Sequence, residues 1–180
     1  WSAPLAAALN VALPVSAKKR DVFVLDSPAK LPGCPLIVDP SGMWMRPEGA
    51  GFLAGAPPRG DDADNTPLDA IDLEQFEAQL WPALAARIPA FEALRVRSAW
   101  AGYYEMNTFD HNGLVGAHPP LDGLLVATGF SGHGMQQAAA AGLGIAECVL
   151  HGGWRTLDLS PLAVGRLLDG RRVVEANVIG

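Results

Sequence analysis

Three closely spaced glycines, with a serine and a histidine among them, stand between an apolar run and a run of alanines. The stretch reads Thr128-Gly-Phe-Ser-Gly-His-Gly-Met135. If a helix begins here, its first backbone N–H groups lack intrahelical acceptors and carry about half a positive elementary charge. Glycines also let a flat ring approach the backbone closely. The stretch therefore predicts a binding site for a planar ligand with negative charge, such as a reduced flavin.

A second interpretation of the same residues is structural. Gly129, Gly132 and Gly134 form the spacing G-x-x-G-x-G, which differs from the G-x-G-x-x-G of dinucleotide-binding turns. Glycines between a strand and a helix commonly serve a tight turn, and His133 would then cap that turn through hydrogen bonds. On these residues alone, the ligand site and the tight turn both stay open.

Composition excludes several classes of partner. The 180 residues are 49% hydrophobic and 18% charged, enough to bury the core of one domain or slightly more. A net charge of −6 and a pI near 5.1 argue against nucleic acid and anionic membranes. No apolar stretch reaches the roughly 18 residues that span a bilayer, and the chain opens without a signal-peptide pattern. We therefore expect no nucleic acid partner and no membrane span.

Cysteine and histidine spacings give no sign of a metal or disulfide framework. Cys34 and Cys148 are far apart and form no Cys-x-x-Cys, which fits a reducing compartment. The histidines lack the His-x-x-x-His spacing of metal ligands on a helix. We expect no metal site.

The elements that must position the glycine stretch are short apolar runs separated by turn signals. A hairpin turn is expected at Pro40-Ser-Gly42, and strands are expected at residues 21–26, 36–39, 43–46, 51–55, 97–106 and 124–127. Helices are expected at residues 2–10 and 72–80, after the glycine stretch, and from Ser160-Pro161 to Gly170. Because strands come first and the long helix comes late, we predict an α+β fold with a mostly antiparallel sheet and flanking helices.

Two of these helices carry further signals. Thr66 and Asp69 have the spacing of a capping box before the helix at 72–80, and Pro82 is expected to interrupt that helix. In the helix after the glycine stretch, apolar and small residues fall on one stripe. The members of this stripe are Met135, Ala139, Gly142, Leu143, Ala146 and Leu150.

A family resemblance supports the ligand interpretation of the glycine stretch. Residues 104–119, Tyr-Glu-Met-Asn-Thr-Phe-Asp-His-Asn-Gly-Leu-Val-Gly-Ala-His-Pro, precede residues 123–134, Gly-Leu-Leu-Val-Ala-Thr-Gly-Phe-Ser-Gly-His-Gly. Together they resemble the C-terminal signature of the FAD-dependent amine oxidoreductases, the superfamily of D-amino-acid oxidase and sarcosine oxidase. Residues 100–104, 107–110, 135–137 and 157–161 resemble its branch of FAD-dependent oxidoreductase domain-containing proteins 1.

The resemblance implies a division of the chain. Residues 1–16 would be the tail end of an FAD-binding domain, 17–120 a substrate-binding domain, 121–155 the returning strand and helix of a Rossmann-like FAD-binding domain, and 156–180 a C-terminal helix and tail. The family's N-terminal G-x-G-x-x-G does not occur in these 180 residues. We therefore expect the chain to be a C-terminal portion whose first partner is the missing N-terminal FAD-binding half.

The same resemblance assigns residues to the cofactor. The backbone around Gly132, His133, Gly134 and Met135 would face the flavin pyrimidine ring. The turn before it would be shaped by Thr128, Gly129, Phe130 and Ser131. Gly102 stands where sarcosine oxidases carry the cysteine that tethers flavin, so FAD is expected to bind non-covalently.

Substrate contacts carry over less completely. Tyr104 matches a substrate-pocket tyrosine, although an ordinary core aromatic is an equal interpretation, and Met45 stands where sarcosine oxidases carry another tyrosine. Arg46 would either pair with a substrate carboxylate or face solvent beside Glu48. Two positions depart from the family pattern: Gln136 replaces a lysine that pairs with the carboxylate, and Pro57 replaces a pocket histidine.

The predicted function is oxidation of a C–N bond in an amine or N-alkyl amino acid by hydride transfer to flavin. The alternative is a catalytically vestigial flavoprotein that serves as an assembly factor or scaffold for a respiratory complex, as the eukaryotic member of the branch does for complex I. A self-standing binding domain is a third, disfavoured option, because it would leave apolar faces exposed. For the isolated chain we expect inactivity and self-association into a homo-oligomer. The expected location is cytoplasmic in a bacterium and the mitochondrial matrix in a eukaryote.

Overall fold

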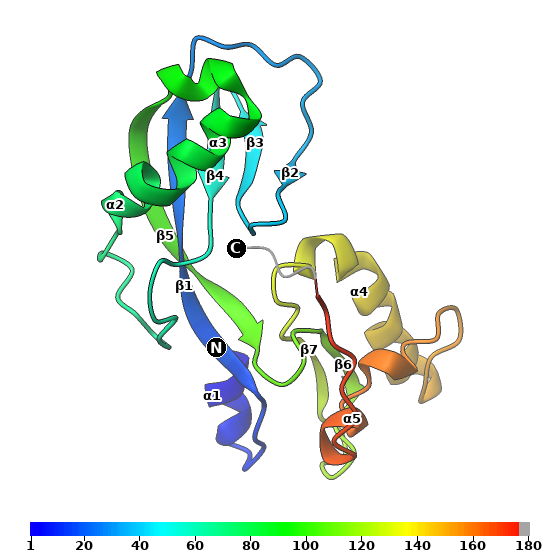
Figure 1. The fold of residues 1–180 in the computed structure, drawn as a ribbon. Helices are drawn as coiled ribbons and strands as arrows, with labels where there is room; N and C mark the ends of the chain where they lie inside the picture. Colours follow the sequence, from blue (N-terminus) through cyan, green and yellow to red (C-terminus); the bar gives the residue numbers. More distant parts are fainter. Residues whose placement is uncertain (177–180) are drawn as a thin grey trace. The chain divides into compact units, whose positions relative to one another are not determined.

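The computed structural model describes residues 1–176, which form two compact units (Figure 1). The sheet unit comprises Lys18–Tyr104, and the glycine-turn unit comprises Trp1–Ala17 with the described residues from Glu105 onward. No helix within residues 1–176 has the length and apolar character needed to cross a membrane. The functional domain limits expected at residues 17, 120 and 155 stay a prediction.

A five-stranded sheet dominates the sheet unit, in the order β2-β3-β4-β1-β5. Its neighbours β2–β3, β3–β4 and β4–β1 pair antiparallel. The strands are β1 (Val15–Asp26), β2 (Ile37–Val38), β3 (Trp44–Glu48), β4 (Gly51–Gly55) and β5 (Arg95–Asn107). The hairpin expected at residues 40–42 joins β2 to β3, and Gly42 adopts φ +84° there. The antiparallel sheet with helices expected from the sequence is confirmed.

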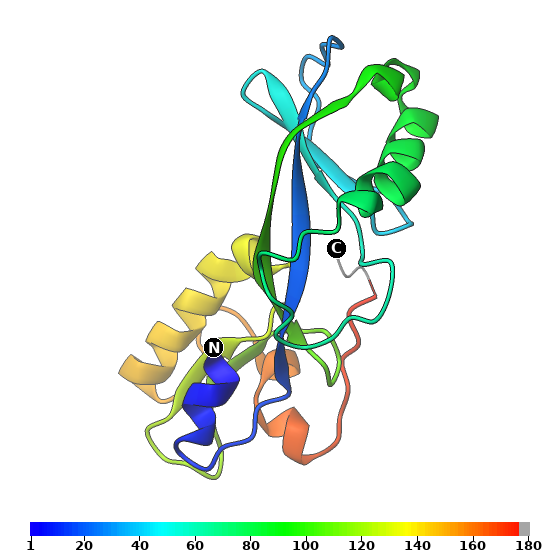
Figure 2. The ribbon, with the colours of Figure 1, turned by 90° about the vertical axis from the view of Figure 1, so that its left-hand side faces the viewer.

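One face of this sheet is covered by a segment of consecutive helical turns with an extended residue at Ile88, which Figure 2 shows from the side. The segment runs through α2 (Leu73–Gln75), the π-helical turn η1 (Phe76–Leu80), α3 (Trp81–Arg87) and the 3₁₀ turn η2 (Pro89–Ala93). Aromatic pairs join the two layers, because the Phe52 and Phe91 ring centroids lie 4.9 Å apart and those of Phe23 and Phe76 lie 5.6 Å apart. Alternate strand residues point into this core, as a period of two requires.

The start of this helical segment differs from the expectation. Asp72, not Thr66, is the N-cap, and its carboxylate accepts the backbone N–H of Gln75 at 3.2 Å. The Thr66 hydroxyl instead donates to the carbonyl of Ala63. A cap must directly precede the first helical residue, and the helix begins at Leu73, too far from Thr66 for a capping box. The capping box was therefore wrong.

Pro82 does not interrupt the helix. Instead, the preceding turn, Phe76–Leu80, widens to a π-helix, and Pro82 stands in the first turn of α3. A proline lacks the N–H that an interior helical position donates, and its ring clashes with the carbonyl four residues earlier. A wide turn relieves both problems, so the chain continues as a helix after a local change of period.

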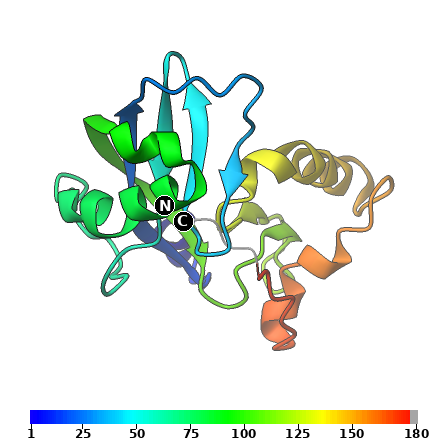
Figure 3. The same cartoon turned by 45° about the horizontal axis from the view of Figure 1, so that its top comes forward.

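The glycine-turn unit is built on a two-stranded antiparallel sheet of β6 (Leu114–Ala117) and β7 (Leu125–Thr128). On one face Val115 packs with Phe130 and with Ala141 of α4 (Gly134–His151). On the other face Leu114 packs with α1 (Ser2–Ala7), residues 11–13 and Val164, which directly precedes α5 (Gly165–Leu168). Figure 3 shows α4 and α5 on either side of this pair of strands.

Two helices of this unit depart from the expectation. The stripe predicted on α4 is not its packed face, because Met135, Leu143 and Leu150 are exposed and the buried positions are Ala141, Gly144 and Glu147. The helix expected after Ser160 is broken into the 3₁₀ turn η3 (Ser160–Leu162) and α5, since the backbone between them is extended at Ala163. Ser160 provides no side-chain cap.

Candidate functional site

The glycine turn between β7 and α4 has an unusual backbone. Gly129, Ser131 and Gly132 have φ of +70°, +47° and +92°. Glycine adopts this left-handed region freely. A residue with a side chain adopts it only at a cost in free energy, because its Cβ crowds the backbone. Ser131 is completely buried, and its hydroxyl oxygen accepts the backbone N–H of Asn107 at 2.9 Å. The turn is therefore held in a strained conformation by a specific partner.

Glu105, on β5, satisfies the first amides of this turn. Its carboxylate accepts the backbone N–H of Gly129 at 3.1 Å and that of Phe130 at 3.3 Å, and it also accepts the Thr128 hydroxyl at 3.1 Å. Its backbone carbonyl accepts the N–H of Ser131 at 3.2 Å. These three amides therefore shape the turn and are not available to a ligand.

Four of the amides that follow have no hydrogen-bond acceptor within the described residues. Within residues 1–176, the backbone N–H groups of Gly132, Gly134, Met135 and Gln136 meet no acceptor. The Met135 side chain is 92% exposed, so it does not cover them. An 18-residue helix begins at Gly134, and its dipole adds positive potential at this point. The turn thus presents a group of unpaired donors to any anionic ligand.

His133 stands at the N-cap of α4 without capping it. Its side chain makes no hydrogen bond to the helix start, and its backbone N–H donates to the carbonyl of Phe130 at 3.0 Å. Its Nδ1 atom is buried and, within the described residues, has no hydrogen-bond partner. A buried nitrogen without a partner at a helix start is the kind of group that a ligand satisfies. The interpretation of His133 as a simple turn cap is not supported.

A buried ion pair lies behind the turn. Arg166 donates from Nε to Asp110 at 2.8 Å, and both side chains are fully buried. Burial, the largest single influence, raises the pKa of Asp110, but the hydrogen bonds from Arg166, Val173 and Asn112 and the charge of Arg166 lower it further, so its net pKa lies below the ordinary value. Asp110 is therefore a carboxylate at neutral pH.

Three of the candidate substrate residues, Met45, Arg46 and Tyr104, belong to the sheet unit. Met45 is 1% exposed in the hydrophobic core. Arg46 forms an ion pair with Glu48, the surface arrangement that was one of its two interpretations. Tyr104 is half-buried, and the Arg20 guanidinium lies 5.0 Å from its ring centroid. Substrate contacts by these residues stay predictions.

Two further positions bear on the predicted chemistry. A Cβ at Gly102 would meet only Trp100, at an ordinary 3.6 Å. Gln136, the fourth residue with an unpaired amide, is exposed and uncharged. Among residues 1–176 there is no group of three or more His, Cys, Asp or Glu side chains placed to hold a metal ion.

Sequence reasoning named the residues of the turn but missed those that support it. Glu105, Asn107 and Asp110 lie inside the quoted stretch 104–119 without a role, and Arg166 lies in a segment given none. Their contacts span 24 to 56 positions along the chain. The available signal was the density of Asp and Asn in residues 107–112, residue types that bind nearby backbone groups.

The architecture has the fold of amino acid oxidases and dehydrogenases. L-proline dehydrogenase from P. horikoshii is similar with a TM-score of 0.77 and 24% identity, over 92% of this chain and 44% of that chain. Glycine oxidase from Geobacillus kaustophilus is similar with a TM-score of 0.75 and 22% identity, over 92% of this chain and 43% of that chain. At these identities the similarity concerns the fold.

Sequence comparison gives the family. The chain belongs to the FAD dependent oxidoreductase (DAO) family, whose family model matches residues 1–148. FAD-dependent oxidoreductase domain-containing protein 1 of Xenopus laevis is 42% identical over 174 residues, covering 94% of this chain and 35% of the relative. The protein of the same name from Bos taurus is 44% identical over 171 residues, covering 93% of this chain and 35% of the relative. The chain therefore spans about a third of the length of these relatives.

Proposed function

We propose that the chain is the C-terminal part of an FAD-dependent oxidoreductase that oxidises a C–N bond in an amine or N-alkyl amino acid. The observation that carries this proposal is the group of unpaired amides at Gly132, Gly134, Met135 and Gln136. They are donors without acceptors at the positive end of a long helix, in a chain whose family is flavin-dependent. When bound, FAD supplies the two-electron oxidation of the substrate.

The residues present fit such a group. The helix-opening amides would hold the pyrimidine end of the flavin and stabilise negative charge there, and the buried Nδ1 of His133 would gain a partner. Gly129, Phe130 and Ser131 would fix the direction of these amides through their bonds to Glu105. No cysteine stands at position 102, which supports non-covalent binding.

Three of the candidate substrate residues, Tyr104, Met45 and Arg46, belong to the sheet unit. Tyr104 is the first candidate contact, because its ring is supported by a fixed neighbour. The Arg20 guanidinium lies 5.0 Å from the centroid of that ring, and its own position is fixed by a bidentate ion pair with Asp62 at 2.8 and 2.9 Å. Met45 and Arg46 are weaker candidates, because one lies in the core and the other is paired with Glu48. β7 and α4 would be the last strand and helix of a Rossmann-like FAD-binding domain completed by the rest of the protein.

A second candidate function is a flavoprotein without turnover that serves as an assembly factor or scaffold. The observation that favours it is the neutral first turn of α4, Gly134-Met-Gln-Gln137, which offers no cation to a substrate carboxylate. A protein of this kind would bind FAD through the same amides.

The test removes one donor from the proposed flavin site in the full-length protein. Met135→Pro deletes a backbone N–H in the first helical turn, where proline is tolerated because that N–H has no intrahelical acceptor. Oxidised flavin is uncharged at its pyrimidine end, and a hydrogen bond between neutral groups contributes about 0.5–1.5 kcal/mol, so FAD affinity should fall by about 2- to 10-fold. Met135→Ala is the matched control, because it truncates an exposed side chain and keeps the amide. FAD binding is measured by titration of the apoprotein.

The outcomes separate the two candidate functions. FAD binding that weakens only in Met135→Pro, with bleaching of the flavin by secondary amines under anaerobic conditions, supports the oxidoreductase. The same binding result without bleaching on a broad amine panel, together with a stable protein partner, supports the scaffold. A full-length protein that is indifferent to FAD would overturn both.

A further inference from the structure

We propose that Arg166 is a positioning residue for the glycine turn, acting through Asp110 and Asn107. The inference rests on the proposed function of that turn as a flavin site. It assigns a role to the C-terminal segment 160–173, which lies beyond the residues 1–148 that match the family model.

Arg166 is only 1% exposed, yet all five of its donor positions are used. Nε and Nη2 donate to the two carboxylate oxygens of Asp110, at 2.8 and 3.1 Å. Nη2 also donates to the carbonyl of Asn112 at 2.9 Å. Nη1 donates to the carbonyls of Leu162 and Ala163 at 2.7 and 3.3 Å. Lysine has no planar fork and could not reproduce this pattern.

Asp110 accepts hydrogen bonds from the loop after β5 and from the C-terminal segment. Besides Arg166, its carboxylate accepts the side-chain amide of Asn107 at 3.0 Å, the backbone N–H of Asn112 at 3.3 Å and that of Val173 at 3.1 Å. Its backbone carbonyl accepts the N–H of Glu175 at 3.0 Å. The carboxylate therefore joins the C-terminal segment to the loop that follows β5.

Asn107 passes this constraint to the glycine turn. It is completely buried, and its side-chain amide donates to Asp110 and to the carbonyl of Asn112 at 2.6 Å. Its backbone N–H donates to the Ser131 hydroxyl at 2.9 Å. Asn107 also packs closely against Gly129. A Cβ added at Gly129 would lie only 3.2 Å from the Cβ of Asn107. Ser131 directly precedes Gly132, whose amide is the first of the unpaired donors.

This arrangement indicates positioning rather than stability alone. A buried ion pair contributes little net stability, because desolvation offsets much of its Coulomb attraction, and an apolar pair of similar volume commonly does as well. The pair instead fixes the orientation of the Asp110 carboxylate, because the two parallel hydrogen bonds from the guanidinium allow only one arrangement. Ser131 is the residue that needs such support, since its left-handed backbone must be held in place by its surroundings.

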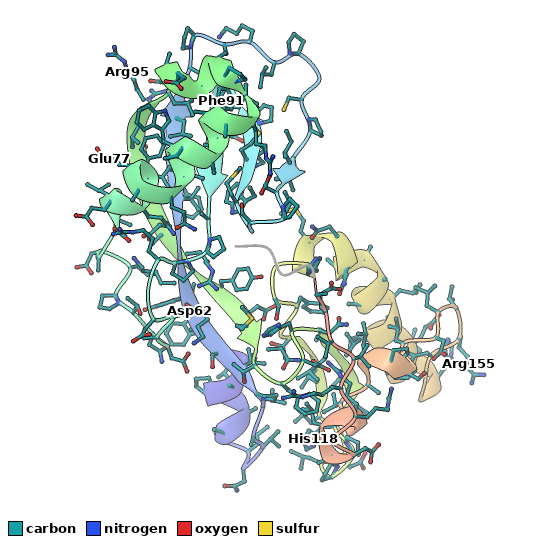
Figure 4. All side chains as sticks on the ribbon, in the orientation of Figure 1. Asp62, Glu77, Phe91, Arg95, His118 and Arg155 are labelled. Carbon is teal, nitrogen blue, oxygen red and sulfur yellow. The ribbon has the colours of Figure 1, made fainter. Side chains whose placement is uncertain are left out.

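The experiment is a double-mutant cycle in the full-length protein, with FAD affinity of the apoprotein as the readout. Arg166→Lys keeps the charge and removes the fork, and Ser131→Ala removes the hydroxyl that connects the network to the turn. Positioning predicts that Arg166→Lys weakens FAD binding by about 10-fold in the wild-type background and by less than about 3-fold in the Ser131→Ala background. Arg155→Lys is the control, because Arg155 is exposed on the loop after α4 (Figure 4).

Two measurements keep the proposal falsifiable. Hydrogen exchange of the apoprotein should speed up at residues 129–136 in Arg166→Lys, and the visible circular dichroism of bound flavin should change. If Arg166→Lys does not purify folded, Asp110→Asn takes its place in the cycle. Additive losses, or unchanged FAD affinity with only a lower melting temperature, would overturn the positioning role.

Failure of the positioning role can be distinguished from failure of the proposed flavin site. If the wild-type protein binds FAD and Met135→Pro weakens that binding while Arg166→Lys does not, only the positioning role fails. If the wild-type protein does not bind FAD, the flavin site itself fails.

Discussion

At the scale of single residues, the turn depends on carboxylate side chains that each bind several backbone groups. Glu105 holds the amides of Gly129 and Phe130, and Asp110 holds those of Asn112 and Val173. Carboxylates suit this task because each has two oxygens and about four lone-pair sites. Removing one would leave several donors without partners at once, so these residues should be far less tolerant than the exposed Met135.

The charge of Asp110 should make the stability of the fold depend on pH. Because the pKa of Asp110 is lower in the folded state than in the unfolded chain, its contribution is present above the ordinary carboxyl pKa of about 3.9 and is lost as the pH falls through the folded value. Asp110→Asn removes this contribution at every pH. We expect Asp110→Asn to cost about 3–5 kcal/mol at neutral pH.

Urea denaturation between neutral pH and pH 3 checks this prediction. The gap in unfolding free energy between wild type and Asp110→Asn should narrow as the pH falls. Asp158→Asn is the control, since the pKa of this exposed carboxyl is also lowered, by its Ser160 contacts, but it lacks an ion-pair partner within the described residues. A gap that stays constant down to pH 3 would contradict the assigned role of the charge.

At the scale of elements, α4 shows how far a sequence pattern determines a packed face. The stripe through Met135, Leu143 and Leu150 has the right period, but those side chains are exposed. The face that is packed within this chain carries Ala141, Gly144 and Glu147, and a Cβ at Gly144 would meet Leu159 and Trp154. Periodicity indicates that a helix has an apolar face, and it says nothing of which segment covers that face.

A pair of valine substitutions tests this assignment of faces. Gly142 and Gly144 lie in the same helix, but a Cβ at Gly142 meets nothing within 4 Å, whereas one at Gly144 would lie 2.3 Å from the Leu159 Cδ1 atom. Gly142→Val and Gly144→Val change helix propensity alike. Overpacking should make Gly144→Val less stable than Gly142→Val by about 1–3 kcal/mol. Thermal unfolding of the 180-residue chain measures the difference, and equal melting temperatures would contradict the packing.

The elements that could be predicted from the sequence depend on near neighbours. The hairpin at residues 40–42 and the strand at 51–55 follow from alternation and turn residues only a few positions apart. The cap at Asp72, the wide turn before Pro82 and the contact of Glu105 with Gly129 depend on segments that meet only in the folded chain. The residues of the glycine turn are contiguous, so the sequence predicts the turn. Its supporting network joins residues 24 to 56 positions apart, which local patterns do not reveal.

At the scale of the whole molecule, the glycine-turn unit exposes apolar side chains on two helices. Leu5 on α1 is 72% exposed, and Val149 and Leu150 on α4 are 65% and 73% exposed. Exposed apolar groups in such number mark a surface that another segment or chain covers. The relatives are about three times as long as this chain, which supports the proposal that the remainder of the protein covers it.

Self-association of the 180-residue chain is the corresponding prediction. With its apolar face uncovered, the chain should form concentration-dependent oligomers, and the double substitution Val149→Lys with Leu150→Lys should shift it toward monomer. Sedimentation velocity measures this shift. Arg171→Lys with Arg172→Lys is the control, since both positions are exposed outside α4. An association state that the α4 lysines leave unchanged would show that another surface is responsible.

The π-helical turn at Phe76–Leu80 has a consequence for the evolution of this chain. A π-turn carries one residue more than an α-turn, so it acts as an insertion absorbed inside a continuous helix. Deleting one residue there would restore the regular period and rotate the preceding turn by about 100° about the helix axis. Phe76 would then leave its contact with Phe23, while Leu84 kept its place in the core. Substitutions at the exposed positions Glu77 and Ala78 should accumulate between homologues, whereas changes in the length of the stretch should be rare.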